Sequence, residues 1–293
     1  MNILITGATG FIGKNLITSL EQKYDIFLLI RETTELTFVS NYNYFCFKDN
    51  IDELSNYIKK NNITGVVHLA SLYVAQHKSD QVKELILSNV YLGTAIIEAS
   101  IKADVVWFIN TGTFWQNFIH DEEQYCPVNL YAASKQAFAD MAKFYTESYP
   151  IKFVTLKLCD TYGPKDTRRK ILNLFKDISI TGESLDMSEG NQVLDILFID
   201  DVINGFEKLI EMMKKPNSEI IKDEYVLTSS KKYRLKDLAK IFTEITGQNL
   251  NINWGKKEYR KREVMIPWER GLKLPNWEPL YTLEDGIKIF MKD

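Results

Sequence analysis

Three glycines spaced three residues apart, at positions 7, 10 and 13, follow the first apolar segment of the chain. The strand-like run 2–6 precedes them and a helix-period segment follows, so the turn joins a strand to a helix. Glycine lets the backbone turn tightly and approach a phosphate closely, and the free amides at a helix N-terminus attract anions. The pattern therefore predicts a dinucleotide-phosphate turn, and a merely tight strand-to-helix connection is the alternative. The residues assigned to this turn are Gly7, Thr9, Gly10, Phe11, Ile12 and Gly13.

Apolar runs of strand length alternate with helix-period segments through the first half of the chain. The predicted strands span 2–6, 26–30, 65–69, 105–110 and 153–158, and the predicted helices span 15–22, 52–60, 82–101 and 129–148. Because parallel neighbours need crossover connections, this alternation predicts an α/β fold with a doubly wound parallel sheet of the Rossmann type. After residue 163 the alternation of strands and helices becomes less regular and its segments shorter. We expect an NAD(P)-binding domain at 1–163, with returning segments near 191–210, and a smaller discontinuous α/β substrate lobe that comprises most of 164–293.

Charge and cysteine content exclude several classes of protein. The formal charge of −3 offers no basic field for nucleic acid, and no apolar stretch approaches the roughly 20 residues of a membrane span. The three cysteines, Cys46, Cys126 and Cys159, are odd in number and lack metal-ligand spacing, which favours reduced thiols and no metal site. No signal peptide is visible at the first residues. We expect a cytoplasmic protein without nucleic-acid or membrane partners.

Tyr131 and Lys135 lie four residues apart on a predicted helix, so their side chains leave the same face one turn apart. A phenol of pKa about 10 is a poor acid–base group at neutral pH, but a neighbouring ammonium favours its ionised form. We therefore expect Lys135 to lower the pKa of Tyr131 and to hold a nicotinamide ribose. Tyr-x-x-x-Lys alone is a weak signal, and its weight here comes from following a glycine turn at a suitable distance.

The glycine spacing in TGATGFIG resembles that of the extended short-chain dehydrogenase/reductases of the NAD-dependent epimerase/dehydratase type. HLAS (68–71) and SNVYLGTAIIEAS (88–100) are similar to further segments of that family. The resemblance implies that Asn89 is a structural or cofactor-proximal residue. The further cofactor contacts that it implies, besides Tyr131 and Lys135, are Asp49, Asn50, Leu69, Ala70, Ser71 and Leu158.

Arg31 stands at the end of the second predicted strand, where NAD-specific folds usually place an acid that binds the ribose 2′-hydroxyl. A guanidinium suits a 2′-phosphate instead, because it is a permanent charge with a planar fork of donors. We therefore favour NADP(H) as the cofactor, with NAD(H) possible. The alternative is that Arg31 is an exposed side chain and that Glu32 takes the ribose.

Compared with the family, Thr111 falls at the hydroxyl of a catalytic triad completed by Tyr131 and Lys135. This resemblance implies that Thr111 binds the substrate oxygen and places it beside Tyr131. Asp160 replaces the usual asparagine of the family's N-x-Y-G-P loop, and Leu194 replaces an arginine that commonly holds a nucleotide diphosphate. Another cation must then hold that group, with Arg168, Arg169 and Arg260 as candidates. The residues assigned to the substrate are Thr111, Thr113, Phe114, Asp160 and Arg168.

Departures from the family argue against water elimination and carbon-acid epimerisation and leave simple hydride transfer. Its dehydratases carry an Asp-Glu pair where this chain has Gly112-Thr113, and its GDP-fucose-forming epimerase-reductases carry a Cys and a His where this chain has Thr113 and Lys165. NTGTFWQ (110–116) and NLYAASKQAF (129–138) resemble bacterial nucleotide-sugar 4-ketoreductases of the CDP-abequose and CDP-paratose synthase type. The resemblance implies NAD(P)H-dependent reduction of the C4 ketone of a CDP-, dTDP- or GDP-linked 4-keto-6-deoxysugar, for O-antigen, lipopolysaccharide or other surface polysaccharide.

Two other functions stay open. A nucleotide-sugar C4-epimerase would use the same triad and retain its NAD, and a non-catalytic NAD(P)-binding regulator would keep the glycine turn without needing Tyr131. The family resemblance also implies a homodimer that forms through helices including the one with Tyr131.

Overall fold

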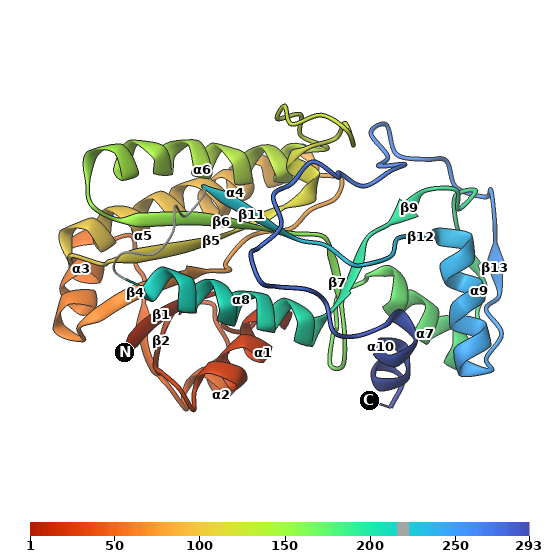
Figure 1. The fold of residues 1–293 in the computed structure, drawn as a ribbon, viewed down its shortest axis with the longest axis horizontal. Coiled ribbons are helices and arrows are strands. Elements are labelled where there is room, and N and C mark those ends of the chain that lie inside the picture. Colours follow the sequence, from red (N-terminus) through yellow and green to blue (C-terminus); the bar gives the residue numbers. More distant parts are fainter. Residues whose placement is uncertain (216–222, 293) are drawn as a thin grey trace.

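A computed structural model describes residues 1–215 and 223–292 and contains one large parallel sheet (Figure 1). Seven strands pair in the order β11-β6-β5-β4-β1-β2-β3, and every pairing is parallel. This confirms the predicted doubly wound Rossmann-type sheet. The strands of the sheet are β1 (Asn2–Thr6), β2 (Asp25–Ile30), β3 (Asn43–Cys46), β4 (Ile63–His68), β5 (Trp107–Thr113), β6 (Lys152–Leu158) and β11 (Glu224–Leu227).

Helices cover both faces of this sheet, because alternate residues of each buried strand face opposite sides. In β1, Ile3 and Ile5 join the apolar cluster of α1 and α8, whereas Leu4 joins the cluster of α3, α5 and α6. Figure 1 shows the two helix layers above and below the strands. The helices of these layers are α1 (Phe11–Leu20), α2 (Leu36–Val39), α3 (Ile51–Lys60), α4 (Val82–Ile86), α5 (Leu92–Lys102), α6 (Leu130–Ser148) and α8 (Ile199–Lys214).

The second lobe consists of short strands and helices at one end of the sheet (Figure 1). Three two-stranded pairs occur in it, β7 with β10, β9 with β12 and β8 with β13. Its helices α7 and α9 both end at a glycine in the left-handed conformation, Gly182 and Gly247. The elements are β7 (Asp160–Tyr162), α7 (Ile171–Thr181), β8 (Leu185–Asp186), β9 (Val193–Leu194), β10 (Ile196–Phe198), β12 (Tyr233–Arg234), α9 (Leu235–Thr246), β13 (Ile252–Asn253) and α10 (Leu283–Phe290).

Some elements differ from their predicted bounds. The strand expected at 105–110 extends to Thr113, because β6 continues beside it and pairs Thr111 with Leu156 and Thr113 with Leu158. Both threonines therefore lie inside a strand and not beyond its end. The sheet also takes in β3 and β11, two four-residue strands too short to show a period, and β11 comes from the part of the chain after residue 163.

The helix expected at 82–101 is continuous but irregular. A π-helical turn, Leu87–Tyr91, separates α4 from α5, and a short 3₁₀ turn, Ser79–Gln81, precedes them. Within the described residues, the stretch Ser79–Lys102 has the length and mean hydropathy (1.3) of a membrane span. The sequence was not expected to hold such a stretch. Half of its apolar window is buried inside the fold, as in a core helix.

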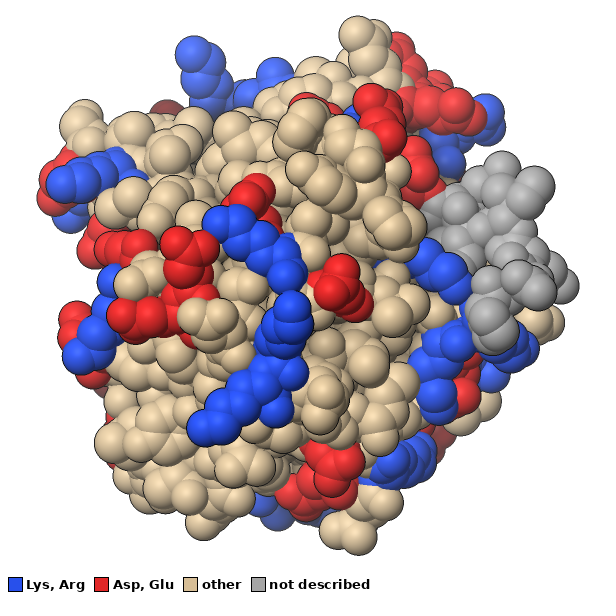
Figure 2. Space-filling model, turned by 90° about the vertical axis from the view of Figure 1, so that its left-hand side faces the viewer, with Lys and Arg blue, Asp and Glu red and all other residues tan. Residues whose placement is uncertain are grey.

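Charged side chains of both signs lie next to one another on the face seen in Figure 2. The three cysteines are free thiols, and none of them is fully exposed. A cavity lies where the carboxyl ends of the central strands meet the second lobe.

Candidate active site

A cavity of about 560 Å³ opens where the glycine turn, β4, β5, β6 and α6 meet the second lobe. Most of the sequence-predicted site residues line it, and six do not. The lining ones are Gly7, Gly10, Phe11, Ile12, Gly13, Leu69, Ser71, Thr111, Thr113, Phe114, Tyr131, Leu158, Asp160 and Arg168. Those outside the lining are Thr9, Arg31, Asp49, Asn50, Ala70 and Lys135.

The glycine turn has no room for a side chain at Gly7 or at Gly13. Gly7 has a φ of +71°, and an added Cβ would lie 2.7 Å from the Ala70 nitrogen. A Cβ on Gly13 would lie 2.2 Å from the Gly7 carbonyl oxygen. α1 follows with Gly10 as its N-cap, without a capping side chain and without an acid in its first turn. This bare, positively polarised helix end fits the pyrophosphate of a dinucleotide.

Thr6 and His68 fix the loop that follows β4. The Thr6 hydroxyl lies 2.9 Å from Nδ1 of His68 and accepts a hydrogen bond from the Ala70 nitrogen. Burial, and then the charge of Lys135, lowers the pKa of His68 to about 3. The imidazole is therefore neutral at physiological pH, and its role in the site is structural.

Asn89 connects the same loop to α6. Its side chain accepts from the Leu72 nitrogen at 2.7 Å and donates to the Leu72 carbonyl at 3.0 Å and to the Ser134 hydroxyl at 2.9 Å. Asn89 lies in the π-helical turn and is 1% exposed. It holds the loop that carries Ser71 against the helix that carries Tyr131.

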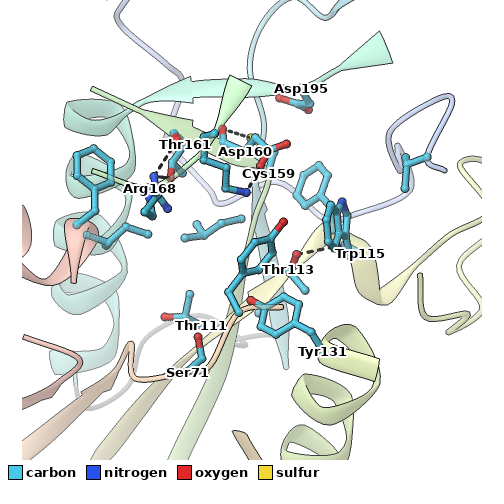
Figure 3. A pocket seen from close by; sticks show the side chains of 18 of the residues that line it. Ser71, Thr111, Thr113, Trp115, Tyr131, Cys159, Asp160, Thr161, Arg168 and Asp195 are labelled. Carbon is cyan, nitrogen blue, oxygen red and sulfur yellow. Dashed lines mark hydrogen bonds and ion pairs between the residues drawn. The ribbon is translucent and has the colours of Figure 1, made fainter. Parts of the chain in front are cut away.

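Thr111 and Tyr131 face the cavity from β5 and from the first turn of α6. Asn129 caps that helix by accepting from the Ala132 nitrogen at 2.9 Å. Figure 3 shows Ser71, Thr111 and Tyr131 on one side of the pocket and Asp160, Thr161 and Arg168 on the other. The Thr111 hydroxyl is buried and has no hydrogen-bond partner within the described chain. A buried hydroxyl without a partner is costly, so this one fits a bound carbonyl or hydroxyl oxygen.

Lys135 lies one turn along α6 from Tyr131, is 2% exposed, and has its pKa lowered to about 8 by burial. Burial also raises the pKa of Tyr131 to about 12, above its usual value. The charge that most opposes this rise is that of Lys170, a cavity residue that the sequence analysis did not assign to the site.

The residues assigned to the substrate are largely engaged with protein. The Thr113 hydroxyl accepts from the Trp115 nitrogen at 3.3 Å, and Phe114 packs edge-to-face on Trp268. Asp160 forms an ion pair with Lys170 at 2.6 Å. Burial acts to raise the pKa of Asp160, but Lys170, Arg168 and Arg260 together hold that pKa below its usual value.

Arg168 and Arg260, two of the candidate diphosphate cations, are already paired. Arg168 makes two hydrogen bonds to Asp166, at 2.7 and 2.8 Å, and lies 4.5 Å over the Phe11 ring. Arg260 pairs with Glu263 at 2.6 Å. Arg169, which also lines the cavity, is exposed.

The outer cofactor residues lie at the surface, beyond the cavity. Arg31 is exposed at the end of β2, and its neighbour Glu32 pairs with Lys48 at 3.2 Å. Asp49 has a φ of +56°. The Asn50 side chain caps α3 by accepting from the Glu53 nitrogen at 3.1 Å, so its side chain already serves the fold.

The cavity lining also includes aromatic and basic side chains that the sequence analysis did not assign to the site. Tyr73 packs edge-to-face on Tyr131 with ring centroids 5.1 Å apart, and the centroid of Trp115 lies 5.6 Å from that of Tyr73. The sequence signal for Lys170 was the basic run 168–170. Among these residues are Tyr73, Trp115, Lys170 and Trp268.

Several known proteins are similar to this chain in sequence or in structure. A CDP-abequose synthase of Salmonella muenchen is 28% identical over 98% of this chain and 95% of its own length, and one of Yersinia pseudotuberculosis is 25% identical over 91% and 92%. The structure of UDP-glucose 4-epimerase from Thermotoga maritima, with UDP-glucose, matches with a TM-score of 0.85 at 21% identity, covering 100% of this chain and 98% of that one. UDP-glucuronic acid 4-epimerase from Bacillus cereus, with UDP-glucuronic acid and NAD, gives 0.84 at 20% identity, covering 100% and 98%.

The family model of the NAD dependent epimerase/dehydratase family matches residues 3–222, about three quarters of the chain. That span includes the glycine turn, Thr111 and Tyr131. The chain therefore belongs to the NAD dependent epimerase/dehydratase family, with its extended short-chain dehydrogenase/reductase fold.

Proposed function

We propose that this protein is a nucleotide-sugar-modifying enzyme that reduces the C4 ketone of a nucleotide-activated 4-keto-6-deoxysugar with NAD(P)H. The observation that carries the proposal is the buried Thr111 hydroxyl, which has no hydrogen-bond partner among residues 1–215 and 223–292 and lies in the same cavity as Tyr131 and the glycine turn. The CDP-abequose synthase relatives, which match over nearly the whole chain, support this substrate class. We assign the cofactor to the sheet domain and the sugar nucleotide mostly to 164–293.

In this reaction the bound nicotinamide supplies a hydride. Thr111 donates its hydroxyl hydrogen to the ketone oxygen and orients it, and Tyr131 then gives that oxygen its phenolic proton. With a pKa of about 12, Tyr131 is protonated at neutral pH, which is the form that a proton donor needs. A C4-epimerase must first remove a hydroxyl proton, for which the ionised phenol is required.

Among the described residues, the carboxylates that line the cavity are all engaged by ion pairs or hydrogen bonds within the protein. Asp160 is paired with Lys170, and Glu263 with Arg260. Asp195 accepts hydrogen bonds from the Thr228 hydroxyl and the Ser229 nitrogen. Elimination of water and epimerisation beside a ketone both need a free acid or base. These pairings support simple hydride transfer.

Incubation with a panel of CDP-, dTDP- and GDP-linked 4-keto-6-deoxysugars tests the proposal. We expect at least one of them to drive consumption of NADPH, measured by the loss of its absorbance. No consumption with any member of the panel would count against the reductase. Turnover without added cofactor, by a protein that carries stoichiometric NAD, would favour the epimerase.

Arg31 is assigned to the 2′-phosphate of NADP(H). We expect Arg31→Ser to weaken NADPH binding roughly tenfold or more, because a charge-assisted hydrogen bond contributes about 1.5–3 kcal/mol, and to leave NADH binding unchanged. Titration calorimetry measures both dissociation constants. Glu32→Gln, a substitution at the adjacent residue, is the matched control. If it weakens NADH binding while Arg31→Ser changes nothing, Glu32 binds the ribose and the cofactor is NAD(H).

An apolar surface on α4, the π-helical turn and α6 supports the expected homodimer. Ile86, Leu87, Tyr91, Met141 and Phe144 are 37–61% exposed, and the Thr94 hydroxyl reaches the Met141 sulfur at 3.2 Å, which places α5 beside α6. Contiguous exposed apolar side chains of this kind mark association surfaces.

We expect light scattering to give about twice the chain mass of 34.0 kDa and Phe144→Glu to return it to that of one chain. Ile180→Glu on α7, which is equally apolar and 67% exposed, is the control and should leave the mass unchanged. A wild-type mass of one chain contradicts the dimer. The three free thiols support the proposed cytoplasmic localisation of an enzyme of surface-polysaccharide synthesis.

A further inference from the structure

Arg168 of the second lobe lies against the first residue of the helix that follows the glycine turn. Its guanidinium carbon is 4.5 Å from the centre of the Phe11 ring, and both side chains line the cavity. Phe11 begins α1 directly after the N-cap residue Gly10. The contact therefore joins the second lobe to the turn that fits the pyrophosphate of a dinucleotide.

Protein groups fix both the backbone and the side chain of Arg168. Its Nε and Nη2 donate to the two carboxylate oxygens of Asp166 at 2.7 and 2.8 Å, and the Asp166 side chain is 0% exposed. Nη2 also donates to the carbonyl and the hydroxyl oxygen of Thr161, both at 2.9 Å (Figure 3). The Arg168 carbonyl accepts from the Asn173 side chain at 2.6 Å. A guanidinium held in this way presents a fixed planar face to its neighbour.

The Phe11 ring also packs against the loop that leads to Arg168. A Cβ added to Gly163 would lie 3.4 Å from Cζ of Phe11 and 2.4 Å from Cγ2 of Ile199, so the tip of the ring lies beside the Gly163 backbone. Phe11 is partly buried and packs on the apolar cluster of α1 and α8. The ring therefore has little freedom to move away from the guanidinium.

The main chain of Phe11 belongs to the anion-binding end of α1. The first amides of a helix have no partner within the helix, and Gly10 supplies no capping side chain. An anion at this end receives its hydrogen bonds from amides of the first turn, one of which belongs to Phe11. A rotation of the first turn changes where these amides point. The Phe11 ring is the part of that turn that Arg168 holds.

We propose that Arg168 is a positioning residue for the cofactor: its guanidinium holds the Phe11 ring, and with it the first turn of α1, in the orientation that binds a dinucleotide pyrophosphate. The proposal rests on the cofactor site of the function proposed above and not on its sugar substrate. It gives Arg168 a role other than the substrate contact expected from the sequence. Because such coupling is reciprocal, a bound dinucleotide in turn stabilises the segment 164–170.

A double-mutant cycle on NADPH binding, measured by titration calorimetry with the full chain, tests the contact. Arg168→Lys removes the planar face but leaves a cation beside Asp166, and Phe11→Leu removes the ring but leaves Arg168 and its pairs in place. We expect each substitution to weaken NADPH binding by about 3- to 10-fold, in the range of a cation–π contact. The double variant should bind about as weakly as the weaker single variant, since one contact is lost only once.

A fragment of the cofactor locates the effect. 2′-Phospho-ADP-ribose keeps the pyrophosphate and lacks the nicotinamide, so both single variants should lose affinity for it by the same factor as for NADPH. Arg262→Lys is the matched control, because Arg262 also stacks on a ring, 4.2 Å from the centre of Phe118, but does not line the cavity. It should leave both affinities unchanged.

Hydrogen exchange gives a second result without any change at Arg168. NADPH at a saturating concentration should slow amide exchange in the segment 164–170 of the wild type, and should slow it much less in Phe11→Leu. Equal slowing in the two proteins, or none in the wild type, would contradict the coupling.

Losses that multiply in the double variant would show that Arg168 and Phe11 act independently, and would overturn the proposal. Wild-type affinity in either single variant would do the same. Unchanged binding of the fragment would also overturn it, because Arg168 would then act at the nicotinamide end. These titrations contain no sugar nucleotide, so they give the same answer whether or not any ketosugar is reduced, and their failure would leave the proposed reductase standing.

Discussion

Tyr131→Phe is expected to lower the rate of ketone reduction by roughly 10²- to 10⁴-fold, the usual contribution of a positioned proton donor. The ring stays in place, so its edge-to-face contact with Tyr73 and the fold around it should persist. Only the hydroxyl that faces the cavity is lost. The dissociation constant for NADPH should change little. Single-turnover oxidation of NADPH and titration calorimetry measure the two quantities.

Tyr145→Phe is the control for this prediction. Tyr145 lies on the same helix, α6, and is buried in the apolar cluster on the far side of the sheet from α1. It does not line the cavity. We expect its rate to remain near that of the wild type. If Tyr131→Phe reduces the ketone at an undiminished rate, Tyr131 is not the proton donor and the assignment of the triad is wrong.

Gly13→Ala is expected to weaken NADPH binding on the order of 100-fold and to destabilise the fold by about 1–3 kcal/mol, as overpacking of a close contact does. The new Cβ would lie 2.2 Å from the Gly7 oxygen and 3.0 Å from the Ala8 Cα, both backbone atoms that cannot rotate away. The start of α1 must then move, and the amides that receive the phosphates move with it. Calorimetry and urea unfolding measure the two effects.

Gly247→Ala separates this effect from a general glycine effect. Gly247 has a φ of +69°, and an added Cβ would meet nothing within 4 Å. The substitution should cost about 1 kcal/mol through backbone strain and leave cofactor affinity intact. Wild-type NADPH affinity in Gly13→Ala would show that the glycine turn does not bind the pyrophosphate.

Local patterns predicted the sheet and the family, because each depends on near neighbours in the chain. The strand 2–6, the glycine turn and the following helix are contiguous, and they form the expected unit with α1 beginning at Phe11. Tyr131 lies at the start of a regular helix, so its place near the strand ends followed from the topology. The resemblance to the extended dehydrogenase/reductases is confirmed by the family match over residues 3–222.

Pairings between distant side chains could not be predicted in the same way. Arg168 was a candidate for a substrate phosphate, but Asp166 and Thr161 already bind its guanidinium. Asp160 and Lys170 meet only because β7 and the start of α7 fold onto the same wall. The Tyr131 pKa also depends on burial, which raises it, and no residue spacing shows how deeply a side chain is buried.

The sequence also did not show which strands form the edges of the sheet. β11 has only four residues, Glu224–Leu227, and is separated from β6 by more than sixty positions, yet it extends the sheet beside β6. A short apolar run far along the chain gives no sign of which sheet it joins.

The most direct measurement follows a labelled hydride into the product. NADPH carrying deuterium at the transferable position of its nicotinamide C4 is incubated with the purified protein and the 4-keto-6-deoxysugar nucleotide that it consumes, and the product sugar is examined by NMR and mass spectrometry. We expect one deuterium at C4 of the sugar for each NADPH oxidised, and almost no product from Tyr131→Phe in the same time. An unlabelled product, or a sugar inverted at C4 without loss of NADPH, would contradict hydride transfer to a ketone as the function of this protein.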